Sequence, residues 1–111
     1  MEDSGLITGY RALLDRQKLG YEVTAFVQVR FASRSPKEGR DFEENIRNTP
    51  EILWCHNVTG PTDFLLCVVA RNTGEYGRFI REQLRPIPSV ISVESTISLM
   101  TVKDDTKVPT N

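Results

Sequence analysis

The sequence predicts an α+β fold in which two helices cover one face of a four-stranded antiparallel sheet. Three observations support this class. Residues 22–32 alternate between apolar and polar side chains, which is the period of a half-buried strand. Two segments, 35–49 and 72–85, begin with helix-capping residues and continue with apolar side chains at helical spacing. The run Phe64–Ala70 is entirely apolar, which is typical of a strand covered on both faces.

The composition indicates one ordinary globular domain. The chain has 111 residues, 39% of them hydrophobic, which suits a single compact unit. Its 14 basic and 15 acidic residues give a net charge of −1, which argues against binding to a phosphate backbone. No apolar run is long enough to cross a membrane, and residues 1–5 do not resemble a signal peptide. These features predict a cytoplasmic protein with no membrane partner.

The first half of the chain predicts one strand and one helix after a short leading segment. Residues 7–14 predict a short strand, and residues 15–20 predict a turn that ends in glycine. Residues 22–32 predict a strand whose apolar face consists of Val23, Ala25, Val27, Val29 and Phe31. Its other face carries Glu22, Thr24, Phe26, Gln28 and Arg30. Ser35, Pro36 and Glu38 then form a capping box, and the helix that follows ends before Pro50.

The second half predicts a hairpin, a helix and a final strand. Residues 52–59 and 63–71 predict two strands joined by a turn at Gly60-Pro61. Residues 72–75 cap a second helix, and the last strand is expected over 90–102. The order strand, helix, strand, strand, helix, strand is the ferredoxin-like βαββαβ arrangement. The expected organisation is a linking segment at 1–20, a ferredoxin-like domain at 21–102 and a flexible tail at 103–111.

The apolar strand 64–70 also predicts an assembly. Because the two helices cover only one face of the sheet, the other face would leave an apolar patch in water. Pairing the sheets of two copies face to face removes this patch and predicts a two-fold dimer. The residues expected at this dimer interface are Phe26, Gln28, Phe64 and Leu66.

The two cysteines and the one histidine predict no metal site and no cofactor. Cys55 and Cys67 flank the turn at Gly60-Pro61, so a two- or three-residue loop would make them face each other or nearly so. No Cys-x-x-Cys pair or cysteine–histidine cluster accompanies them, and we expect reduced thiols that pack as small apolar side chains. His56 has no partner at ligand spacing and is expected on an exposed strand face.

Two stretches resemble a known family. The segment Ile7–Asp15 with Leu19-Gly20, and the segment Pro50–Leu66, follow the order and spacing of the Lrp/AsnC (feast–famine) transcriptional regulators. The resemblance extends from about Gly5 to Val102 and corresponds to their carboxy-terminal effector-binding and oligomerisation (RAM) domain. It implies a ferredoxin-like domain that dimerises through its sheet, assembles into rings of dimers, and binds an amino acid or related metabolite between dimers.

The chain departs from that family in two respects. It lacks the amino-terminal winged helix-turn-helix domain, so DNA would be bound only through a domain absent from this chain. Residues 1–7 resemble the last residues of that domain, while a natural stand-alone effector domain is the alternative. The family also carries an aromatic residue where Thr62 stands, which affects the expected shape of the effector pocket.

The loop at Thr59, Gly60, Pro61, Thr62 and Asp63 is the candidate effector site. Gly60 lets backbone N–H groups approach a carboxylate closely, and Asp63 can accept from an ammonium group. Together they suit the two charges of a free amino acid. The alternative is that Asp63 only closes the turn by accepting from backbone N–H groups.

Two other functions share this order of elements. RNA-recognition domains carry a basic residue, a glycine and stacking aromatics on their third strand, whereas residues 63–69 have a single aromatic. A small dimeric ferredoxin-like enzyme, such as an oxygenase-like α+β barrel, would need a catalytic pair of polar residues, and the sequence shows none. We therefore expect a binding domain with no catalytic residues, and not an enzyme.

Overall fold

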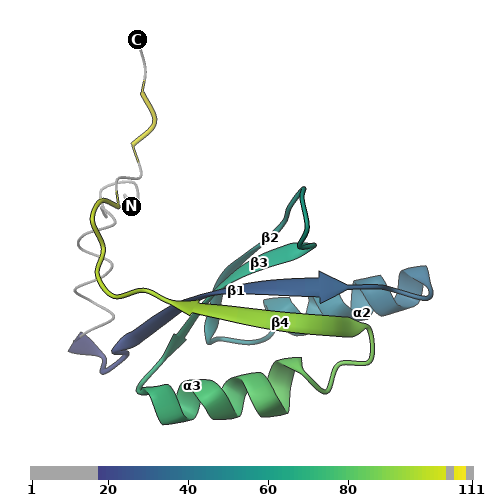
Figure 1. Ribbon diagram of the computed structural model, residues 1–111, viewed down its shortest axis with the longest axis horizontal. Helices are drawn as coiled ribbons and strands as arrows, with labels where there is room; N and C mark the ends of the chain where they lie inside the picture. The colour runs from purple at the N-terminus through teal and green to yellow at the C-terminus, as the bar shows by residue number, and fades with distance from the viewer. Residues whose placement is uncertain (1–17, 105–106, 110–111) are drawn as a thin grey trace.

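The computed structural model describes residues 18–104 and 107–109 (Figure 1). The predicted strand at 7–14 lies outside these residues. The described elements are β1 (Val23–Phe31), α2 (Pro36–Arg47), β2 (Ile52–Asn57), β3 (Phe64–Ala70), α3 (Thr73–Phe79), the π-helix η2 (Ile80–Leu84) and β4 (Val90–Ile97). This confirms the predicted βαββαβ order, with the two helical segments on one side of the sheet.

The four strands form one antiparallel sheet in the order β2-β3-β1-β4. Strand β1 lies at the centre because it pairs with β3 on one side and with β4 on the other. Its alternation sets the faces of the whole sheet, since residues directly opposite each other across two strands point to the same side. Val27, for example, lies opposite Leu66 of β3 and Ser95 of β4. We call the side that carries the helices the helical face and the other side the open face.

The hydrophobic core lies between the helical face and the two helical segments. Alternate residues of β1 are buried as predicted, while those between them are largely exposed. Helix α2 contributes Phe42 and Ile46, which lie one helical turn apart and therefore point to the same side. The helical segment α3–η2 contributes the other buried side chains, namely Tyr76, Phe79, Ile80 and Leu84.

The caps predicted for both helices are present. The Ser35 hydroxyl accepts from the Glu38 N–H at 3.3 Å, and the Glu38 carboxylate accepts from the Arg34 N–H at 2.8 Å. The same carboxylate also accepts from the Ser89 hydroxyl at 2.5 Å, which ties α2 to the loop before β4. These two hydrogen bonds hold the pKa of Glu38 below its usual value. The second helix begins at Asn72, whose side chain accepts from the Glu75 N–H at 2.8 Å.

The structure differs from the predictions most clearly in the second helix, the last strand and the turn between β2 and β3. The second helix widens into the π-helix η2, in which the Arg85 N–H donates to the Ile80 carbonyl at 3.0 Å. The last strand ends at Ile97 instead of Val102 because its partner β1 begins only at Val23; the last hydrogen bond runs from the Ser98 N–H to the Thr24 carbonyl at 2.8 Å. The turn between β2 and β3 is longer than predicted and comprises residues 58–63.

Candidate functional site

The loop of residues 58–63 lies at the end of the sheet where β1 ends and β3 begins. Gly60 has a φ of 105°, a conformation that side-chain-bearing residues rarely adopt. A Cβ atom at this position would meet nothing within 4 Å, so backbone strain, not lack of space, favours glycine there. Thr59, Gly60 and Pro61 are exposed, which leaves the tip of the loop open to a ligand.

Asp63 anchors this loop to strand β1. Its N–H donates to the Val29 carbonyl at 3.0 Å, and its carboxylate atom Oδ2 accepts from the Phe31 N–H at 2.8 Å. The neighbouring Thr62 hydroxyl also donates to the Val29 carbonyl, at 3.0 Å. The Asp63 carbonyl accepts from the Asn57 side-chain amide at 2.8 Å. The carboxylate therefore accepts from a backbone N–H, as in the alternative interpretation, but the donor belongs to β1 and not to the turn.

The open face carries a different set of β3 residues from the set predicted. Phe64 and Leu66 lie opposite Val29 and Val27, so both point to the helical face, and Leu66 is completely buried. Their predicted place on the open face is therefore wrong, because β3 is apolar on both sides and its own sequence cannot reveal its orientation. Phe26 and Gln28 do lie on the open face, and the β3 residues beside them are Leu65, Cys67 and Val69.

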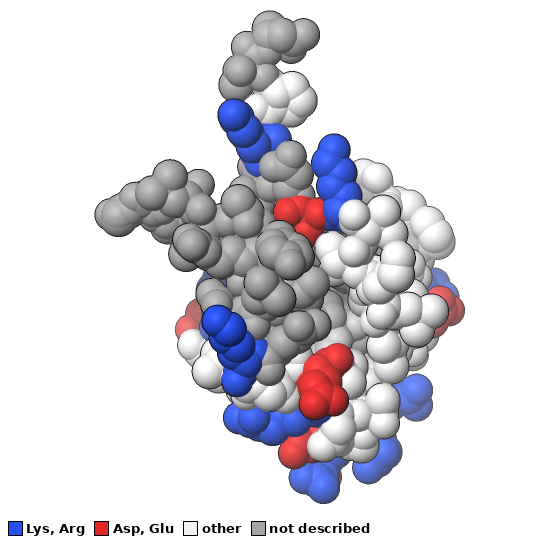
Figure 2. All heavy atoms as spheres, turned by 90° about the vertical axis from the view of Figure 1, so that its left-hand side faces the viewer, with Lys and Arg blue, Asp and Glu red and all other residues white. Residues whose placement is uncertain are grey.

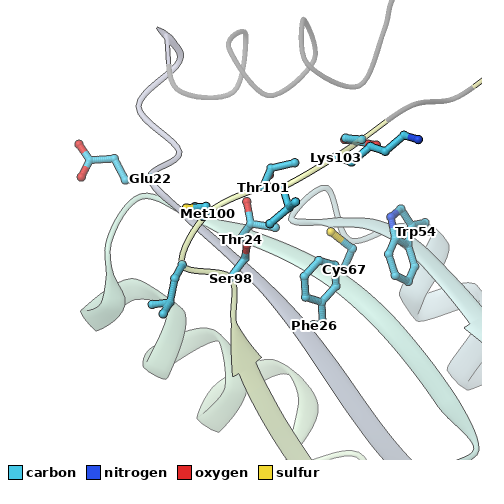
Figure 3. A pocket seen from close by; sticks show the side chains of 12 residues that line it. Glu22, Thr24, Phe26, Trp54, Cys67, Ser98, Met100, Thr101 and Lys103 are labelled. Carbon is cyan, nitrogen blue, oxygen red and sulfur yellow. The ribbon is translucent and has the colours of Figure 1, made fainter.

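The open face has an apolar half formed by β2, β3 and the middle of β1. The rings of Phe26 and Trp54 lie 6.1 Å apart, and each residue is 37% exposed. Together with Cys67 they line a hollow of about 640 Å³ that the segment after β4 partly covers. Figure 3 shows this segment, residues 98–104, passing over the hollow.

The other half of the open face is polar and borders the loop. A second hollow, of about 540 Å³, lies between β1, β4 and the loop, and its lining residues are Gln28, Arg30, Pro61, Thr62, Ser92 and Glu94. Two residues of the predicted effector loop, Pro61 and Thr62, are among them. Gln28 and Arg30 share one strand face, as predicted, but Arg30 was not among the predicted site residues. Glu94 was not predicted either, because no sequence signal sets the register between β1 and β4.

The two cysteines lie on opposite faces of the sheet. Cys55 lies opposite Leu66 on the helical face, whereas Cys67 lies opposite Trp54 on the open face. The expectation that they face each other is therefore wrong, since the longer loop starts the pairing at Asn57 and Phe64 and thereby places Cys55 one position away from Cys67. Burial raises the pKa of the Cys55 thiol, and the nearby Glu43 carboxylate adds to that rise, so the group stays protonated.

The remaining polar groups do not form a metal site in the part of the chain that the structure describes. His56 is exposed, as predicted, and its ring lies 5.2 Å from that of Trp54 on the open face. On the side of the molecule shown in Figure 2, Lys and Arg side chains are scattered with Asp and Glu among them. No helix among residues 18–104 and 107–109 is long and apolar enough to cross a membrane.

Comparisons with known proteins identify the domain. The family model described as the Lrp/AsnC ligand binding domain matches residues 24–108. The chain is 34% identical over 102 residues to the proline dehydrogenase transcriptional activator of Rhodobacter capsulatus, covering 92% of this chain and 66% of that protein. It is 33% identical over 108 residues to the leucine-responsive regulatory protein of Rhizobium meliloti (strain 1021), covering 97% and 69% respectively.

The solved structures agree with this result. A transcriptional regulator from Neisseria meningitidis, determined as an L-Met complex, superposes with a TM-score of 0.81 and 29% identity over 97% of this chain and 70% of that chain. The chain spans about two thirds of the length of the curated relatives named above. These relatives are transcriptional regulators, and this confirms the expectation that the chain is not an enzyme. The comparisons do not favour the alternative of an oxygenase-like enzyme. The match over residues 24–108 confirms the family resemblance, and the chain belongs to the Lrp/AsnC family of ligand-binding domains.

Proposed function

We propose that this chain is the effector-binding and oligomerisation domain of an Lrp/AsnC-type transcriptional regulator that senses an amino acid or a related small metabolite. The family match over residues 24–108 carries this proposal. In this proposal DNA is bound through a helix-turn-helix domain, and the elements described in residues 18–104 and 107–109 do not form one. Because a regulator of transcription acts where the DNA is, we propose that the protein is cytoplasmic.

The chemistry around the loop supports an amino-acid effector. A free amino acid carries one carboxylate and one ammonium group, and it is recognised by a cation or N–H donors together with an anion. The hollow beside Thr62 offers both charges within one cavity, on strands that the core holds in place. Thr59 and Gly60 are exposed, and their backbone N–H groups are further donors. Among the relatives, one is named as leucine-responsive and one structure contains L-Met.

A thermal-shift screen with the twenty common amino acids tests this function. A ligand that binds only the folded state, at about 100 times its Kd, adds about 2.7 kcal/mol of stability. For a domain of this size, that corresponds to a rise in Tm on the order of 10 °C. We expect such a rise with one or a few of the twenty amino acids. A Tm that none of them changes would contradict the proposed function.

We also propose that the apolar half of the open face pairs with that of a second copy, and that such dimers assemble into a ring. Phe26 and Trp54 would be buried there, together with the side of β3 that the helices do not cover. The substitution Phe26→Asp is expected to reduce the mass in light scattering to that of a monomer, because it places a charge in this contact.

The matched control for this substitution is Ile97→Asp. Ile97 is 40% exposed, close to the 37% of Phe26, but it lies opposite Ala25 and so belongs to the helical face. This variant should keep the mass of the unchanged protein. Two results in light scattering would rule out pairing through this face. One is that the unchanged protein is a monomer at micromolar concentration, and the other is that the Phe26→Asp variant has the same mass as the unchanged protein.

A further inference from the structure

The polar hollow beside the effector loop has the composition of a binding site for a zwitterion. Its floor consists of side chains from β1 and β4, and its wall is formed by Pro61 and Thr62. The lining contains one cation, Arg30, one anion, Glu94, and several uncharged hydrogen-bonding groups. The hollow of about 540 Å³ is large enough to hold a single amino acid.

Arg30 and Glu94 are placed to act on the same small molecule. Arg30 lies opposite Ser92, and Gln28 lies opposite Glu94, so the two charged residues are diagonal neighbours on the open face. Such neighbours have Cα atoms roughly 7–8 Å apart, within reach of long side chains. Nevertheless, they form no ion pair with each other or with any other described residue. Both side chains are exposed, and their charged groups are available to a ligand.

The wall of the hollow is held rigidly by hydrogen bonds to β1. The Thr62 hydroxyl donates to the Val29 carbonyl, which fixes its orientation and leaves its oxygen free to accept. The next residue, Asp63, is tied to the same strand through its N–H and its carboxylate. A ligand entering the hollow therefore meets a preorganised surface, which lowers the entropic cost of binding.

Glu94 is better placed than Asp63 to bind the ammonium group of a ligand in this hollow. The Asp63 carboxylate accepts from the Phe31 N–H through Oδ2, and its other oxygen can still accept, but Asp63 does not line the hollow. Glu94 has no hydrogen-bond partner among the described residues and lies directly in the lining of the hollow. Arg30, a planar donor with several N–H groups, is suited to binding a carboxylate with two parallel hydrogen bonds.

We propose that a free α-amino acid binds in this hollow, with its carboxylate on the Arg30 guanidinium and its ammonium group on the Glu94 carboxylate. Gln28, Ser92 and Thr62 complete its hydrogen bonds. This inference rests on the proposed function and assigns the ligand's charged groups to residues on two strands of the sheet. The site lies beside the apolar half of the open face, so a second copy over that half would narrow its mouth and strengthen the charge interactions by excluding water.

The test compares the unchanged 111-residue protein with its Arg30→Gln and Glu94→Gln variants. The probes are the twenty common L-amino acids, each also supplied as its N-acetyl and carboxamide derivatives, with affinity measured by calorimetry. We expect each variant to lose affinity for the free amino acid by about tenfold or more, since each loses a charge-assisted hydrogen bond. The controls are Arg81→Gln and Glu82→Gln, on exposed positions of η2, and they should bind like the unchanged protein.

The derivatives identify which charge each residue binds. The N-acetyl form lacks the ammonium group, so Glu94→Gln should bind it about as well as the free amino acid. The carboxamide lacks the carboxylate, so Arg30→Gln should no longer distinguish it from the free amino acid. Unchanged affinity in both variants would overturn this inference while leaving the proposed function intact.

Two further outcomes would also overturn this inference. If none of the twenty amino acids binds the unchanged protein, the proposed function fails and this site fails with it. If Arg30→Glu and Glu94→Arg each lower the mass in light scattering, and the double variant restores the mass but not the affinity, the two residues pair between copies of the chain. Site-specific loss of affinity with unchanged mass is the result that supports amino-acid binding.

Discussion

Replacing Phe42 by alanine is expected to lower the free energy of unfolding by about 3–5 kcal/mol, the range for deleting a buried aromatic ring. Phe42 is 2% exposed, and its ring centroid lies 4.5 Å from that of Phe31 and 4.9 Å from that of Phe64. These three rings join α2 to the adjacent ends of β1 and β3. The substitution removes the central ring and leaves a cavity that backbone on three elements cannot readily fill.

Urea denaturation at equilibrium measures this loss, and Phe42→Leu provides the matched control. Leucine keeps most of the buried volume, so this variant should lose far less stability than the alanine variant. Because Phe64 directly follows Asp63, the Phe42→Ala variant should also loosen the loop at 58–63. If Phe42→Ala lowers the free energy of unfolding by less than about 1 kcal/mol, this aromatic cluster does not hold α2 against the sheet.

Asp63→Ala is expected to lower the free energy of unfolding by about 1.5–3 kcal/mol, the range for a hydrogen bond to a charged group. The substitution removes the acceptor for the Phe31 N–H at the end of β1. The loss should lie toward the lower end of this range, because Asp63 is only partly buried and water can reach the freed N–H. Asp63→Asn keeps an acceptor oxygen and should recover much of the stability.

Affinity for amino acids, measured on the same two variants, separates the two roles of Asp63. If Glu94 holds the ammonium group, Asp63→Asn should bind nearly as tightly as the unchanged protein. A loss of affinity in Asp63→Asn at unchanged Tm would instead support the sequence-based prediction that Asp63 holds the ligand. An Asp63→Ala variant as stable as the unchanged protein would show that the Asp63 carboxylate does not stabilise the end of β1.

Local sequence patterns were sufficient to predict the order and type of the elements. The alternation in 22–32 identified β1 and the correct residues on each of its faces, because one face packs on the core and the other does not. Ser35 and Asn72 marked the starts of the two helices, because their side chains accept from backbone N–H groups three residues later. A turn at Gly60 was likewise predicted, and this residue has a φ of 105°.

The sequence by itself therefore determined the fold and the family, and only the tertiary structure decided the orientation of β3 and the composition of the site. A strand that is apolar on both sides carries no period-two signal, so its pairing with β1 decided that Leu66 faces the helices and Cys67 the open face. Pairing across strands also brought Arg30 near Glu94, although 63 intervening residues separate them in the sequence. Such long-range register depends on how the whole sheet assembles, and no short segment of the sequence records it.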